Sequence, residues 1–233
     1  MTDANRDKLI VALDLPSAEA ARALVDRLGS EVSFYKVGLE LLFSGGLALA
    51  KDLKSSGKRV FLDMKLLDIG NTVERAVATA AQLGVDFLTV HGHDRKTLDA
   101  AVKGRGTAPL KLLAVTVLTS LDAGDLAEQG TSMQPAELVL KRARLAHAAG
   151  FDGVISSGHE AAAVRAATGP GFLIVTPGIR LPGGAAGDQT RITTPEKALA
   201  DGANHLVVGR PINAAPDPVQ AARSFLEHIA KAV

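Results

Sequence analysis

The feature that most constrains the fold is a unit of about 29 residues that recurs along the 233-residue chain. Each unit has a short apolar run rich in β-branched residues, then a turn, then an alanine- and charge-rich amphipathic stretch. A strand followed by a helix is the repeat that builds parallel sheets. We therefore predict eight strands, at residues 8–14, 33–39, 59–65, 86–91, 110–118, 153–157, 172–176 and 205–209.

Eight alternating strands and helices form either a closed barrel or an open doubly wound sheet. The open sheet usually carries G-x-G-x-x-G after its first strand, where this chain has DLPSAEA. The number of units and the absence of this motif favour a (β/α)8 TIM barrel, with residues 1–233 as a single domain. Two long irregular segments, 119–134 and 180–193, are interpreted as loops within the barrel series.

Helix ends are marked by residues with specific backbone preferences. Two predicted helices begin with an N-cap residue and proline, at Thr194-Pro195 and Asp217-Pro218, and Asn71 with Glu74 resembles a capping box. Glycine follows five helical stretches, where a left-handed residue ends a helix without strain, at Gly29, Gly57, Gly84, Gly150 and Gly202.

Composition excludes several classes of function. The formal net charge of +1 provides no general attraction for nucleic acid or an anionic membrane. No apolar run reaches the roughly 18 residues of a membrane span, and the N-terminal MTDANRDKLI is too charged for a signal peptide. The chain has no cysteine, so disulfides and thiolate chemistry are excluded. A cytoplasmic enzyme is the simplest interpretation.

Charged residues stand where three predicted strands end. Side chains alternate between the two faces of a strand, so Asp63 and Lys65 in VFLDMKLLDIGNTV share one face and the apolar residues between them take the other. The apolar face packs against helices, which directs the charged side chains into the barrel mouth. The same alternation places Lys36 of SFYKVGL and Asp14 of LIVALDL there.

These four groups are expected to form a functional cluster, because catalytic side chains of barrels come from the carboxyl ends of strands. The alternative is an ion-pair network that only closes the barrel, but partly buried charges cost several kcal/mol unless paired, and such clusters favour active sites. Asp63 and Asp68 flank Lys65, and nearby carboxylates keep an ammonium group charged. A protonated lysine suits a reaction whose transition state gathers negative charge on carbon.

A phosphate site is predicted after the last two strands. Barrels often bind phosphate there through backbone N–H groups and a cation, and Gly209-Arg210 supplies both. The glycine-rich segment 181–191 has the composition of a lid, with Gln189 and Arg180 as candidate contacts. The alternative is a flexible loop with a solvated arginine.

The chain resembles the orotidine 5′-phosphate decarboxylase family. Its motifs occur in the family's order and spacing over essentially the whole chain: VALDL, YKVGLEL, FLDMKLLDIGNTV, VLTS, TPGIR, GDQTR and VVGRPI. The resemblance implies a decarboxylation without cofactor or metal that produces UMP, the final step of de novo pyrimidine nucleotide synthesis. It also implies a homodimer with active sites at the subunit interface.

The resemblance also implies residue roles. Lys65 resembles the family's proton donor, with Lys36, Asp63 and Asp68 completing its charge network, and Asp68 and Thr72 resemble residues that reach the neighbouring subunit's site. The remaining matches are substrate contacts: Asp14 and Lys36 for the ribose hydroxyls, Thr119 and Ser120 for the pyrimidine edge, and Arg180, Gln189, Gly209 and Arg210 for the phosphate. The chain departs from the common bacterial pattern K-x-H-D-I-P-N-T by having Leu67 and Gly70, which affects loop rigidity and interface packing rather than charge.

Two alternatives remain open at this point. A metal-dependent sugar-phosphate decarboxylase or synthase shares D-x-K-x-x-D but holds magnesium with a carboxylate on the second strand. Lys36 occupies that position here, although Glu40 lies four residues on, and His91 and His93 are a weak candidate metal pair. The second alternative is a non-catalytic phosphate-binding barrel, which has no use for so costly a charged cluster.

Overall fold

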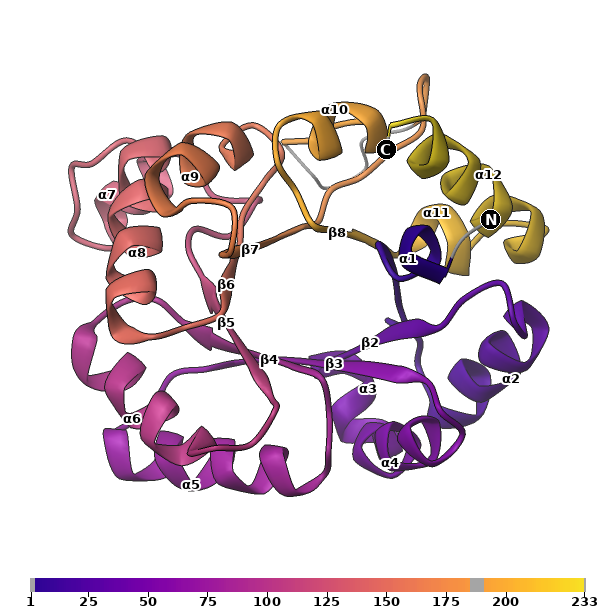
Figure 1. The fold of residues 1–233 in the computed structure, drawn as a ribbon, viewed down its shortest axis with the longest axis horizontal. Coiled ribbons are helices and arrows are strands. Elements are labelled where there is room, and N and C mark those ends of the chain that lie inside the picture. Colours follow the sequence, from indigo (N-terminus) through magenta and orange to yellow (C-terminus); the bar gives the residue numbers. More distant parts are fainter. Residues whose placement is uncertain (1–2, 185–190, 233) are drawn as a thin grey trace.

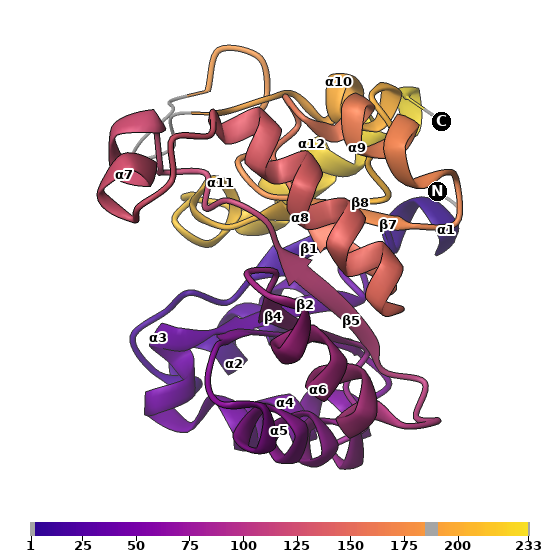
Figure 2. The same ribbon diagram turned by 90° about the vertical axis from the view of Figure 1, so that its left-hand side faces the viewer.

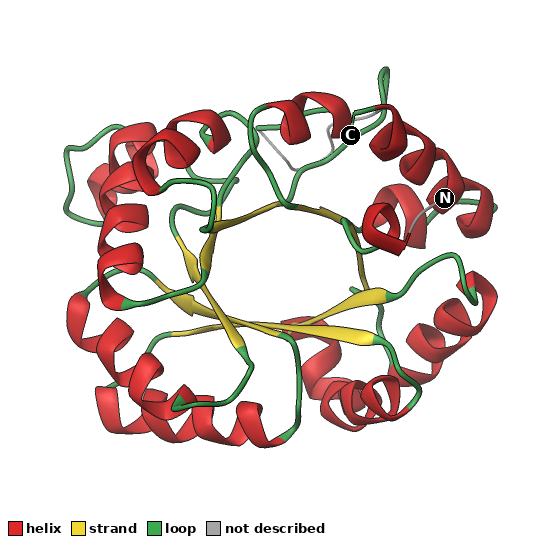
Figure 3. Cartoon of the chain, in the orientation of Figure 1, coloured by secondary structure: helices red, strands yellow, loops and turns green. Residues whose placement is uncertain are grey.

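The eight strands close into one parallel barrel in the order β1-β2-β3-β4-β5-β6-β7-β8, as predicted. The computed structural model describes residues 3–184 and 191–232. Figures 1 and 3 show the strands as an inner ring enclosed by helices. The strands are β1 (Leu9–Ala12), β2 (Phe34–Gly38), β3 (Arg59–Leu66), β4 (Phe87–His91), β5 (Lys111–Val115), β6 (Gly153–Ile155), β7 (Leu173–Thr176) and β8 (His205–Val208).

Helices follow the strands around the outside of the barrel, and Figure 2 shows them from the side. Within the described residues no helix is long and apolar enough to cross a membrane. The elements are α1 (Asp3–Arg6), α2 (Ala18–Leu28), α3 (Leu39–Leu41), η1 (Leu42–Gly46), α4 (Leu47–Ser55), α5 (Gly70–Gln82), α6 (Arg95–Arg105), α7 (Ala123–Glu128), α8 (Pro135–Ala149), α9 (Ala161–Thr168), α10 (Pro195–Ala200), α11 (Arg210–Asn213) and α12 (Pro218–Lys231).

Two separate apolar layers hold the barrel together. The larger lies between the strands and the helices and contains the outward-facing residues of each strand, such as Tyr35, Val37 and Leu62. The smaller fills the barrel interior with Ile10, Ala12, Phe34, Phe61, Phe87, Leu113, Val175 and Val207. Strand alternation thus sorts the side chains as predicted, and the interior layer forms a floor beneath the carboxyl ends of the strands.

The predicted helix ends are mostly confirmed. All five glycines have positive φ, from 53° at Gly29 to 100° at Gly202, and Thr194 and Asp217 cap α10 and α12 with their side chains. The capping box at Asn71 and Glu74 was a wrong prediction, because α5 already begins at Gly70 and has no side-chain cap. The segment 119–134, predicted as a loop, contains the short helix α7. This helix begins with a capping box formed by Asp122 and Asp125.

Candidate active site

A cavity of about 630 Å³ opens at the carboxyl ends of the strands. Its floor is apolar and includes Phe61, Val115 and Val207. Its walls include nine of the residues predicted for the site: Asp14, Lys36, Asp63, Lys65, Thr119, Ser120, Arg180, Gly209 and Arg210.

Four charged side chains of alternating sign form a continuous chain across this cavity. The Lys36 ammonium lies 3.0 Å from Asp14 Oδ1 and 3.3 Å from Asp63 Oδ2. Asp63 Oδ2 also lies 2.8 Å from the Lys65 ammonium. Lys36 and Asp63 are each only 8% exposed, whereas Asp14 is exposed at the rim. The cluster predicted from strand alternation is therefore present, with its centre buried.

Mutual attraction keeps the two buried groups charged. Burial raises the pKa of the Asp63 carboxyl, but Lys36 and Lys65, with hydrogen bonds from Lys65 and Thr89, hold it below its ordinary value. Burial lowers the pKa of Lys36, and the carboxylates of Asp63 and Asp14 outweigh this and raise it. A carboxylate and an ammonium group thus lie fixed beside the Lys65 ammonium before any ligand enters.

The backbone of β3 changes direction at Lys65. Lys65 is the one non-glycine residue with positive φ (49°) among the described residues, and the register between β3 and β4 shifts between Leu62 and Leu66. Its N–H donates to Thr89 Oγ1 over 2.9 Å, and the Thr89 hydroxyl donates to Asp63 Oδ1 over 2.9 Å. A left-handed lysine is strained and persists only where its surroundings hold it, which Thr89 of β4 does.

Two residues of the site were missed by the sequence analysis. Thr89 stands within an apolar run of the sequence and is fully buried. Only the pairing of β3 with β4 in the structure shows its role. Gly38 ends β2, and a Cβ there would lie 2.8 Å from Asp14 Oδ1 and 3.0 Å from Lys36 Nζ. Glycine at this strand end leaves room for the ion pair, and its place directly after YKV was the available signal.

The residues predicted for phosphate gather on the side of the cavity formed after β7 and β8. Arg180 is buried and its guanidinium donates to the Ile179 carbonyl over 2.9 Å. Gly209 ends the loop after β8, and Arg210 is the first residue of α11. Gln189 lies outside the described residues.

Asp68 and Thr72 do not join this cluster within one chain. Both are exposed, and neither lines the cavity. Asp68 Oδ1 accepts a hydrogen bond from the Ile69 N–H over 2.7 Å, as a turn residue does. Among the described residues of a single chain, Lys65 therefore pairs with one carboxylate, that of Asp63.

The candidate metal ligands are also not assembled. Glu40 does not extend β2 but lies in α3 after the strand has ended. His91 and His93 line a different pocket, beside the cavity. The described part of the chain contains no group of three or more histidine, cysteine, aspartate or glutamate side chains that could hold a metal ion.

A closed parallel barrel with charged side chains at the carboxyl ends of its strands defines a (β/α)8-barrel enzyme. Comparison with known proteins gives the family. The sequence profile of the "Orotidine 5'-phosphate decarboxylase / HUMPS family" matches residues 7–225. This chain belongs to that family.

Relatives match over nearly their full length. An orotidine 5′-phosphate decarboxylase of Rhodopseudomonas palustris (strain HaA2) is 54% identical over 229 residues, which cover 98% of this chain and 97% of the relative. One from Methylobacterium sp. (strain 4-46) is 54% identical over 230 residues, covering 97% of each. The crystal structure of orotidine 5′-phosphate decarboxylase from Lactobacillus acidophilus superposes with a TM-score of 0.83 at 38% identity, covering 95% of this chain and 98% of that one.

Proposed function

We propose that this enzyme decarboxylates orotidine 5′-phosphate to UMP in pyrimidine nucleotide synthesis. The observation that carries the proposal is the buried Lys36–Asp63–Lys65 array at the carboxyl ends of β2 and β3. Family membership and relatives that carry this activity in their names support the same reaction.

The chemistry follows from the position of two charges. Asp63 would lie beside the departing carboxylate, and the Lys65 ammonium beside C6 of the pyrimidine. As the bond from C6 to the carboxylate breaks, CO2 leaves and its electron pair stays on C6. Lys65 stabilises this carbanion and transfers its proton to C6, which completes UMP. Because the negative charge on C6 appears only as CO2 departs, a fixed ammonium favours the transition state over the ground state.

The other cavity residues are proposed to bind the rest of the substrate. Asp14 and Lys36 would contact the ribose hydroxyls, and Thr119 with Ser120 the pyrimidine edge. The phosphate would be held by Arg180, Gln189, Gly209 and Arg210. Support comes from the arrangement of the described members of this set around one cavity, from the ribose side at β1 and β2 to the phosphate side after β7 and β8.

We also propose a homodimer in which Asp68 and Thr72 complete the partner's site. Asp68 is exposed and has no place in its own cavity, while its neighbours Leu67 and Ile69 are apolar yet 50% and 73% exposed. Phe43 of η1 is 88% exposed. Large apolar groups at the surface favour a protein interface. A two-fold axis at this surface would bring each Asp68 toward the other Lys65.

The assay that tests the reaction follows the absorbance of orotidine 5′-phosphate with and without EDTA. We expect substrate loss at the same rate in both, because the ammonium of Lys36 stands where the metal-dependent alternative needs a carboxylate. Activity lost in EDTA and restored by magnesium would favour the sugar-phosphate enzymes instead. Binding of substrate without turnover would favour a non-catalytic barrel.

A further inference from the structure

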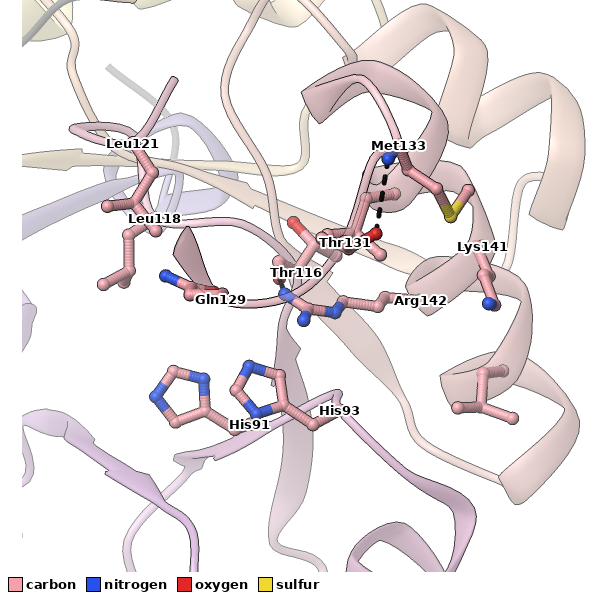
Figure 4. Close-up of a pocket in the computed structure, with 12 residues that line it drawn as sticks. His91, His93, Thr116, Leu118, Leu121, Gln129, Thr131, Met133, Lys141 and Arg142 are labelled. Atoms are coloured by element: carbon pink, nitrogen blue, oxygen red, sulfur yellow. Dashed lines mark hydrogen bonds between the residues drawn. The ribbon is translucent and has the colours of Figure 1, made fainter. Parts of the chain in front are cut away.

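A second pocket, of about 550 Å³, lies beside the active site. It is bounded by the ends of β4 and β5, by the segment that carries α7, and by α8. Figure 4 shows the His91 and His93 rings side by side, with Arg142 and Gln129 facing them. The ring centroids are 4.7 Å apart and the planes are tilted by 35°. We call this the basic pocket and define it by His91, His93, Lys141 and Arg142.

The charged side chains that line the basic pocket are all positive. Among the described residues that line it there is no aspartate or glutamate. Arg142 is half-buried and donates to the Thr116 carbonyl, a neutral acceptor that does not compensate its charge. The nearby Asp94 does not line the pocket and caps α6 through hydrogen bonds from the Thr97 N–H and hydroxyl. Its carboxylate raises the pKa of His93, but by less than Arg142 lowers it. A partly buried cation without a carboxylate is costly, and a bound anion would offset that cost.

The two imidazoles experience the same excess of positive charge. Burial lowers the pKa of His91 to about 4, with further lowering by His93, Arg142 and Lys65 and a smaller opposing effect of the Asp63 carboxylate. Burial and then Arg142 also lower the pKa of His93, against a smaller opposing effect of Asp94. His91 Nδ1 is buried and has no hydrogen-bond partner in the described part of the chain. The positive charges of Lys141 and Arg142 attract an anion, whose arrival would favour protonated rings.

We propose that the basic pocket binds a small organic anion, with a phosphate or carboxylate group held between the Arg142 guanidinium and the two imidazoles. A guanidinium group matches the oxygen spacing of both groups, and Gln129 and Thr131 supply further polar contacts. The rest of the lining is largely apolar and suits the body of an organic molecule; it includes Leu118, Leu121, Met133, Leu138 and Leu145.

The test is an NMR titration of the full-length protein at pH 7 and constant ionic strength. The ring C–H signals of His91 and His93 are assigned from the H91N and H93N variants. Inorganic phosphate should shift both signals in a saturable way and raise the pKa of His93. Phenyl phosphate should bind roughly tenfold tighter than inorganic phosphate, because its ring can contact the apolar lining.

Control variants separate this pocket from the active site, which also has arginines on its phosphate side. R142Q should weaken the response of His93 roughly tenfold or more, since it removes a charged hydrogen-bond donor. R210A, which alters the active-site cavity, should leave the response unchanged. H93N keeps the contact of Arg142 with Thr116 and should still weaken the response of His91. Shifts that do not saturate, or that persist in R142Q and vanish in R210A, would overturn the proposal.

Discussion

Thr89 links the two charged residues of β3 to the neighbouring strand. Its hydroxyl accepts a hydrogen bond from the Lys65 N–H and donates one to Asp63, and its side chain is fully buried. One hydroxyl therefore holds the left-handed backbone of Lys65 and orients the carboxylate beside it. At this scale the site depends on a residue that never carries charge.

T89V tests this positioning role because valine keeps the shape of threonine and removes the hydroxyl. We expect kcat to fall roughly ten- to a hundredfold, since a hydrogen bond to a charged group is worth about 1.5–3 kcal/mol, with a smaller change in KM. T89S retains the hydroxyl and should restore most of kcat. Equal impairment of T89S and T89V, or wild-type kcat in T89V, would show that the hydroxyl is not used.

The segments after β7 and β8 contribute the cavity residues that are farthest in the sequence from Asp63 and Lys65. Arg180 and Arg210 both line the cavity; Arg180 lies in the segment after β7, and Arg210 is the first residue of α11. A phosphate held there does not react. Its binding energy can instead orient the reacting ring and close a lid.

R210A and Q189A should therefore lower kcat/KM on orotidine 5′-phosphate although neither residue is expected to touch the departing carboxylate. Loss of one charged contact predicts about a tenfold decrease or more for R210A. The decisive comparison uses orotidine, the nucleoside without phosphate, on which both variants should match the wild type. Equal losses on both substrates would mean that these residues do not hold the phosphate.

Strand periodicity predicted the elements well and the irregular positions poorly. Alternation placed Lys36 and Asp63 correctly, because both stand on regular, paired strands. Lys65 reaches the cavity as expected, but through a left-handed backbone and a register shift that no period-two pattern contains. Thr89 was missed for the same reason. The capping box at Asn71 failed because the turn after Ile69 starts α5 earlier than the side-chain pattern indicated.

At the scale of the whole molecule, a half-buried histidine, His205, lies at the amino-terminal end of the barrel. The His205 ring packs edge-on against Phe34 and Phe87, with centroids 5.8 and 5.3 Å away, and Nδ1 lies 2.9 Å from the Asp7 carbonyl oxygen. Burial is the main cause that lowers its pKa from 6.5 to about 4. The folded protein therefore keeps this ring neutral over a pH range in which the unfolded chain protonates it.

The free energy of unfolding should fall as the pH drops from about 6.5 toward 4, because the unfolded chain then binds a proton that the folded protein does not. H205Q should lose less stability than the wild type between pH 7 and 5. Urea denaturation at a fixed protein concentration measures this, and a single transition would also support residues 1–233 as one domain. Equal losses in both proteins would contradict the assignment to His205. The pKa of His91 is also lowered to about 4, so the variant H91Q should likewise lose less stability than the wild type over this pH range.

The cytoplasmic location and the dimer both remain predictions at this scale. The first is tested by cell fractionation. The second has a direct consequence for the active site, because Asp68 is exposed and absent from its own cavity. If the partner subunit completes each site, Lys65 and Asp68 of one working site come from different chains.

The most direct test of the account mixes two inactive variants, K65A and D68A, under conditions in which subunits exchange. K65A lacks the proton donor, and D68A lacks the carboxylate that completes the partner's charge array. In a mixed dimer one site collects both changes and the other has neither. Random pairing makes half of the dimers mixed, so about a quarter of all sites should regain decarboxylation of orotidine 5′-phosphate. If exchange is confirmed independently and the mixture stays inactive, each site is built from one chain and the shared charge array is wrong.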